Sequence, residues 1–113
     1  MASTKQFLDR ILDGLSLVEG VSSRKMMGEY LIYVRGILIG GIYDDRLLVK
    51  PIPSALDRLP HASFVEPYHG ASKMLMVDKL DDKLYLKELV EAVADEIEEE
   101  REKETGVDSH YES

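Results

Sequence analysis

The stretch "RKMMGEYLIYVRGILIGGIYDDRLLVK", residues 24–50, decides the fold because two tight turns divide it into apolar segments. Arg35 and Gly36 form the first turn, where glycine supplies the positive φ that a two-residue hairpin loop needs. Asp44 and Asp45 form the second turn, since aspartate side chains can bond their own backbone. The pattern predicts an antiparallel meander with strands at 25–34, 37–43 and 46–50.

The first predicted strand is apolar on both sides. Its alternating side chains are Leu31 and Tyr33 on one side, and Tyr30, Ile32 and Val34 on the other. An antiparallel sheet with helices on one face normally has polar residues on the other. We therefore expect a second copy of the protein to cover the second face, forming a homodimer. The alternative is that helix ends and residues 51–61 cover this face within one chain.

The other two strands carry special positions. Gly40 and Gly41 lie inside the middle strand, where glycine usually marks a bend, a bulge or a close backbone approach. We favour a bend that curls the sheet over a helix, with ligand access as the alternative. In the third strand, Leu47 and Val49 alternate with Arg46, Leu48 and Lys50, a pattern that suits an edge strand.

Helices are predicted at both ends of the meander. Ser3 and Gln6 form a capping box for the first helix, whose apolar stripe is Phe7, Leu8, Ile11, Leu12 and Leu15. Prolines limit a second helix to about 53–59, with Leu56 and Leu59 facing inward. Asp81 or Asp82 caps a long third helix, whose stripe is Leu86, Leu89, Val90, Val93, Ala94 and Ile97.

The segments "ASFVE" (62–66) and "KMLMVD" (73–78) between these helices read as two more strands. The fold class is therefore α+β: a two-layer domain with one antiparallel sheet and the order α-β-β-β-α-β-β-α. The domain is expected over residues 1–97, followed by an acidic helix end and a disordered tail at 98–113. Residues 95–113 hold nine acids and two bases, a net charge of -7, which leaves the body close to neutral.

The residues that carry chemistry form no recognisable reaction centre. The chain has no cysteine, and His61, His69 and His110 have no metal-ligand spacing. We therefore expect no catalytic residue, metal or cofactor, and predict that the protein is not an enzyme. The start "MASTKQFLDR" is not a signal peptide and no apolar run could span a membrane, so we expect a cytoplasmic protein without membrane contact.

Two segments carry candidate contacts to a partner or ligand. "RKMMGEY" combines two cations with adaptable methionines, and "EPYHGASK" is a glycine-containing loop of the kind that often carries function. The candidate residues are Arg24, Lys25, Met26, Tyr30, Ile32, Lys50, Tyr68, His69 and Lys73.

The chain resembles the TfoX N-terminal domain family over about residues 5–97. The matching features are "KMMGEY" (25–30), Tyr33, Gly36, "DDRLLVK" (44–50), "PYHGA" (67–71) and "LDDKLYLKELV" (80–90). Met27 stands where this family often has phenylalanine. The resemblance implies a fold similar to type III secretion chaperones and a link to the regulation of competence, the uptake of DNA by bacteria. It implies no catalytic residues.

Three functions compete at this point. The leading hypothesis is a non-catalytic interaction or regulatory module that acts through contacts with an unknown protein partner. The second is a nucleic-acid-associated transcriptional regulator that uses Arg24, Lys25, Arg35, Arg46, Lys50 and Lys73, although direct DNA binding is not expected for a body without net positive charge. The third is a small-molecule binder that uses the loop at 67–73.

Overall fold

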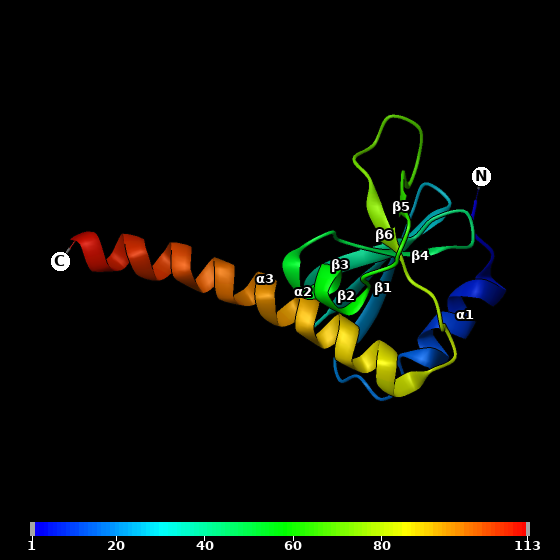
Figure 1. The fold of residues 1–113 in the computed structure, drawn as a ribbon, viewed down its shortest axis with the longest axis horizontal. Helices are drawn as coiled ribbons and strands as arrows, with labels where there is room; N and C mark the ends of the chain where they lie inside the picture. The colour runs from blue at the N-terminus through cyan, green and yellow to red at the C-terminus, as the bar shows by residue number, and fades with distance from the viewer. Residues whose placement is uncertain (1, 113) are drawn as a thin grey trace.

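The computed structural model describes residues 2–112, with side chains from residue 2 to residue 104. Its elements are α1 (Lys5–Gly14), β1 (Val21–Met26), β2 (Glu29–Val34), β3 (Ile37–Ile42), β4 (Leu47–Val49), α2 (Pro53–Arg58), β5 (Phe64–Val65), β6 (Met74–Met76) and α3 (Lys83–Glu112). The strands form one antiparallel sheet in the order β1-β2-β3-β4-β6-β5. Figure 1 shows α3 passing under the sheet and extending well beyond it. The predicted α+β class is confirmed.

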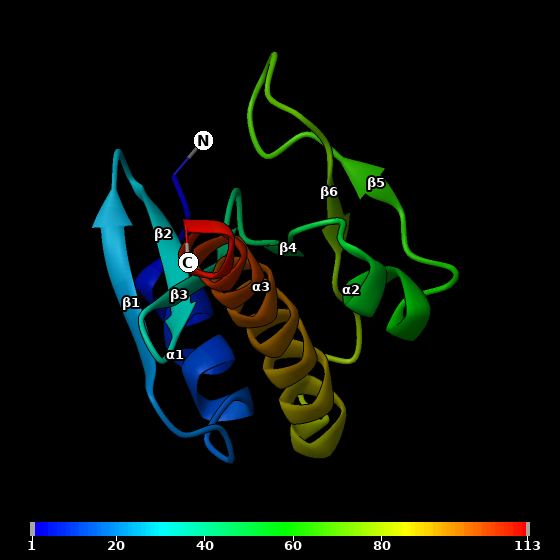
Figure 2. The ribbon, with the colours of Figure 1, turned by 90° about the vertical axis from the view of Figure 1, so that its left-hand side faces the viewer.

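The helices share one face of the sheet. Buried side chains of α1, α2 and α3 belong to a single hydrophobic cluster together with Ile32, Ile39 and Val49 of the strands. Figure 2 shows α3 crossing the sheet, with β1 and β2 on one side of it and β5 and β6 on the other. The predicted apolar stripes of the two long helices supply most of the helical part of this core. The other face of the sheet has no helix over it among residues 2–112.

The prediction of one strand over 25–34 is wrong, because a hairpin divides this region into β1 and β2. Met27 and Gly28 form the turn with φ values of 52° and 85°, which is the two-residue geometry that matches strand twist. Residues 21–23 lie outside the predicted elements, and in the structure they begin β1. The observed order therefore has one strand more than predicted, α-β-β-β-β-α-β-β-α.

A bulge and a close backbone approach explain the glycine pair. The β2–β3 register shifts between Ile32, which faces Gly40, and Tyr33, which faces Leu38, so Ile39 is the extra residue. A methyl group on Gly40 would overlap the carbonyl oxygen of Leu48 and lie 2.8 Å from the Cα of Val49. Gly40 therefore allows the backbones of β3 and β4 to approach closely.

Several local predictions need correction. β4 is not an edge strand, since β6 pairs on its outer side and all three of its residues are buried. Thr4, not Ser3, caps α1 by accepting a hydrogen bond from the backbone N–H of Phe7. Leu56 of α2 is exposed and Ala55 is the buried residue of this helix, whereas Leu59, directly after α2, is buried as predicted.

The cap of α3 is as predicted, because Asp82 accepts a 3.1 Å hydrogen bond from the N–H of Tyr85. The helix continues past residue 97 to Glu112, and the side chains of residues 98–104 are exposed. Side chains from residue 105 onward lie outside the described part, so the disordered tail stays a prediction.

Candidate functional site on the uncovered sheet face

The face of the sheet that carries no helix is apolar at its centre. The strand pairings place one row of residues across this face: Arg24, Leu31, Gly41, Leu48 and Met76. Leu48 is fully buried, yet it lies outside the core cluster that the helices share. The ring of Tyr43 lies over Gly41, since a methyl group there would be 2.7 Å from its Cε2 atom. The aromatic side chain of Tyr43 therefore covers part of this face.

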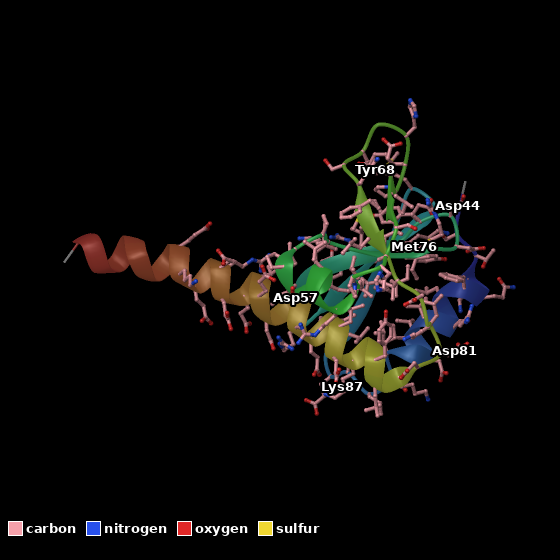
Figure 3. All side chains as sticks on the ribbon, viewed as in Figure 1. Asp44, Asp57, Tyr68, Met76, Asp81 and Lys87 are labelled. Carbon is pink, nitrogen blue, oxygen red and sulfur yellow. The ribbon has the colours of Figure 1, made fainter. Side chains whose placement is uncertain are left out.

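A groove of about 580 Å3 opens at one end of this face. Its lining residues come from the N-terminus, the β1–β2 hairpin, the end of β3 and the loop between β5 and β6: Ala2, Met26, Met27, Glu29, Leu31, Tyr43 and Tyr68. The rings of Tyr43 and Tyr68 lie 6.4 Å apart between centroids, at 51°. Figure 3 shows Tyr68 beyond Met76, on the side of the sheet opposite to Lys87 of α3. The groove thus joins four segments that are distant in sequence.

The groove exposes its apolar side chains to solvent. Met27 is 95% exposed and Tyr68 is 66% exposed, while Met26 is about half exposed. Large apolar side chains that gather on one surface are a common mark of a binding site. Methionine suits such a surface because its unbranched side chain adapts to different shapes.

A hydrogen-bond network holds the polar side of the groove. The Ser3 hydroxyl donates to the carboxylate of Glu29 (2.6 Å) and accepts from the N–H of Asp45 (3.1 Å). The N–H of Asp44 also donates to Glu29, at 3.3 Å from each carboxylate oxygen. The N–H of Thr4 donates to Asp45 (2.8 Å), so the N-terminal segment is tied to the β3–β4 turn. Glu29 therefore acts as a structural acceptor, with its charge already solvated by the protein.

The structure brings together only some of the predicted site residues. Met26 and Tyr68 both line the groove, although 41 positions separate them. Arg24 and Lys25 lie exposed on β1 next to it. His69 and Lys73 are exposed on the β5–β6 loop, and Lys50 is half-buried after β4, but none of the three lines the groove.

The prediction that Tyr30 and Ile32 contact a partner is wrong, because both lie on the helix-covered face. Ile32 is 0% exposed and Tyr30 is buried beside it in the core cluster. The bulge and the hairpin at Met27 decide which face each residue of β2 takes, and the sequence pattern left this choice open. Burial in the core leaves neither side chain on the surface that a partner would contact.

Groove residues that the sequence did not single out are Ala2, Met27, Glu29, Leu31 and Tyr43. Recognition of the Met27–Gly28 turn would have placed Met27 at an exposed hairpin tip. Tyr43 directly precedes the turn at Asp44 and Asp45, and this position of a large aromatic residue is a signal that could have marked it as a candidate. Nothing in the sequence indicates that the N-terminal segment reaches this site.

The basic residues proposed for nucleic-acid contact do not form one free stripe. Arg35 forms a 2.7 Å ion pair with Asp95 of α3. The guanidinium of Arg46 donates to the backbone carbonyls of Tyr43 (3.1 Å) and Glu66 (3.4 Å). Two of the six candidate cations are therefore already engaged within the domain.

One titratable group that lines the groove, the phenol of Tyr43, has a shifted pKa. Burial raises the pKa of Tyr43, and the neighbouring Tyr68 and Glu29 raise it further, so its hydroxyl stays neutral at physiological pH. A neutral phenol can donate or accept a hydrogen bond, but it is a weak nucleophile. Among residues 2–104, no group of three or more His, Asp or Glu side chains is placed to hold a metal ion.

A second, smaller depression of about 190 Å3 lies between α2 and the start of α3. Tyr85 donates a 2.6 Å hydrogen bond to Asp78 there, and the ammonium of Lys79 lies 5.2 Å from the centroid of the Tyr85 ring. Burial and the Asp78 carboxylate both raise the pKa of Tyr85. These contacts satisfy the tyrosine and link α3 to the preceding loop.

Comparison with known proteins adds no assignment to this site. No protein-family model matches the chain, and neither a curated protein nor a solved structure matches it. Within the described helices, no segment is long and apolar enough to cross a membrane.

Proposed function

We propose that this protein is a non-catalytic interaction module, and that the groove on the uncovered sheet face is its binding surface for a protein partner. The observation that carries the proposal is the exposed apolar lining formed by Met26, Met27 and Tyr68 around a groove of about 580 Å3. A regulatory role in the cytoplasm, of the kind that the resemblance to competence regulators implies, belongs to this proposal.

The groove has the properties of a binding site on a rigid support. Its floor is a sheet, its polar wall is held by Ser3 and Asp45, and its apolar walls are open to solvent. Interface centres are typically rich in tyrosine and methionine and poor in charge. The one carboxylate in the lining, Glu29, is satisfied by internal hydrogen bonds and would need no new partner when the groove is filled.

The experiment is partner capture from the native cell with matched variants, followed by quantitative mass spectrometry. Tyr68→Ala removes an aromatic side chain from the groove, and Leu84→Ala removes an equally exposed apolar side chain (67%) from α3, outside the groove. We expect a defined partner to be lost about tenfold or more with Tyr68→Ala, as for an interface hot spot, and to be retained with Leu84→Ala. Partners that respond equally to both variants, or to neither, would contradict the proposal.

A second copy of the chain is the other candidate occupant of this face. Leu31, Tyr33 and Leu38 remain half-buried there, which favours further covering. Within residues 51–61, Ala55 and Leu59 pack in the core cluster on the helix side, which disfavours the alternative that this segment covers the face within one chain. Sedimentation equilibrium at tens of micromolar tests the homodimer. Leu31→Lys is the variant that should disrupt the dimer, since Ile32→Lys would place a charge in the core. A monomer mass for the unmodified chain would exclude the dimer.

A further inference from the structure

The strand β1 is an open edge of the sheet. It pairs with β2 on one side and is the terminal strand of the sheet on the other. Figure 2 shows it at the outer left of the domain, with no other described element beyond it. Five of its six residues are exposed, from Ser22 to Met26. An exposed edge presents unpaired N–H and C=O groups that can template another strand.

The register shows which backbone groups are free. Met26 faces Glu29 across a two-residue turn, so these two residues form a hydrogen-bonded pair. Hydrogen-bonded pairs alternate with non-hydrogen-bonded pairs, so the backbone groups of Ser22 and Arg24 also point toward β2. The N–H of Arg35 donates to the carbonyl of Gly20 (2.8 Å), which agrees with this alternation. The groups that point away from the sheet belong to the three intervening residues, Val21, Ser23 and Lys25.

Two cations mark this edge. Arg24 projects on the uncovered face beside Leu31, and Lys25 projects on the opposite face beside Tyr30. Within residues 2–104, neither cation forms an ion pair or a side-chain hydrogen bond. The nearest acidic group of the groove, Glu29, is engaged by Ser3 and by the Asp44 N–H. The edge therefore has uncompensated positive charge next to an apolar groove.

This charge disfavours a second β1 as the pairing strand. An antiparallel copy centred on Ser23 would place the two Arg24 side chains diagonally on the same face, within reach of each other. Charged residues on an edge strand commonly prevent such self-pairing. An extended segment that carries carboxylates would instead gain from the same two cations.

The geometry points to β1 as an acceptor for an extended acidic segment of a protein partner, which adds a seventh strand to the sheet and places an apolar side chain in the groove beside Met26. This inference rests on the proposed function and names the chemistry of the partner. An antiparallel segment would place three successive residues opposite Met26, Lys25 and Arg24. The matching order is one apolar residue followed by two acidic residues, because the first and third face the groove side and the second faces the helix side.

The test uses a short fluorescent peptide of alternating valine and threonine with a central Leu-Glu-Glu step, titrated into the full chain. A peptide with Leu-Lys-Lys at the centre is the matched control. We expect the acidic peptide to bind at least about tenfold more tightly than the control, and the double variant Arg24→Glu, Lys25→Glu to reverse this preference. Equal binding of both peptides, or no binding of the acidic peptide at millimolar concentration, would overturn the inference.

A backbone variant separates strand addition from simple charge attraction. Ser23→Pro removes one outward N–H at an edge position where proline is tolerated, whereas Ser23→Ala leaves the backbone intact. Strand addition predicts at least a tenfold loss of peptide affinity for Ser23→Pro and little change for Ser23→Ala. In amide exchange by NMR, the peptide should protect Val21, Ser23 and Lys25 and leave the exchange of Ser22 and Arg24 unchanged.

The outcomes distinguish this inference from the proposed function. If the captured partner depends on Tyr68 but is unaffected by Ser23→Pro, the groove binds its partner by another mode and strand addition is wrong. If the partner is indifferent to Tyr68→Ala, the proposed function fails by itself. The same three amides could also become protected without peptide, to a degree that rises with protein concentration. That result would identify a second copy of the chain as the occupant and would overturn the inference.

Discussion

Replacing Met27 with asparagine should stabilise the protein while it weakens binding at the groove. Met27 has a φ of 52° at the first position of a two-residue turn, followed by Gly28 with a φ of 85°. The left-handed region costs an ordinary L-residue about 1–2 kcal/mol, and asparagine tolerates it better because its short side chain bonds locally. Asparagine followed by glycine is the preferred pair for this turn.

The magnitude follows from the exposure of the side chain. Since Met27 is 95% exposed, its removal sacrifices almost no buried apolar area. The relief of backbone strain then dominates, and we expect a gain of about 0.5–1 kcal/mol in the free energy of unfolding. With an unfolding entropy of about 2.1 cal/mol/K per residue, a chain of this length should gain about 2–4 °C in Tm.

Thermal melts followed by circular dichroism provide the assay, with Met26→Asn as the matched control. Met26 is a strand residue and its side chain is about half-buried, so the same change one position earlier should lower Tm. Partner or peptide affinity should fall for Met27→Asn despite the gain in stability. A lower Tm for Met27→Asn would refute the reasoning, since it would mean that this side chain packs against the domain or that the turn has another geometry.

Two further predictions concern the body and the tail. Gly40→Ala should destabilise the protein by about 2 kcal/mol or more in a urea titration, because the new methyl group meets the backbone of Leu48 and Val49. A rotamer change cannot relieve this overpacking. Gly36→Ala is the control for the cost of backbone conformation, since Gly36 has a φ of 76° and open space around its Cβ position. An unchanged midpoint for Gly40→Ala would disprove the close approach of β3 and β4. Deletion of residues 102–113 should change the free energy of unfolding by less than about 1 kcal/mol, because residues 102–104 are exposed and the sequence beyond them is mostly polar; a loss of several kcal/mol in denaturant melts would show that this segment docks on the body.

Local features of this protein could be predicted from its sequence because their causes lie within a few residues. The turns at Arg35–Gly36 and Asp44–Asp45 occur where predicted, with all four residues at positive φ. The predicted stripe of α3 is fully buried from Leu86 to Ala94 and partly buried at Ile97, and Asp82 caps the helix as predicted. Periodicity and capping depend on neighbouring residues of one segment, so they can be read without knowledge of the fold.

The edge strand β1 escaped prediction because it has no apolar alternation of its own. Its residues "VSSRKM" are mostly polar, and pairing with β2 supplies its structure. The central position of β4 was missed for a similar reason, since β6 adds to it from a distant part of the chain. Strand order depends on long-range pairing, and the local pattern does not encode the partner.

The candidate site is a product of tertiary structure. The sequence indicated Met26 and Tyr68 separately, but only the sheet brings both to one groove with Tyr43. The sequence also predicted a strand with two apolar faces and did not indicate which face packs against the helices. In the structure, Ile32 lies in the core and Leu31 lines the groove. In an antiparallel sheet, a single bulge or hairpin turn reverses which side chains face the helices. This choice is therefore made by the packing of the whole domain and not by any one segment.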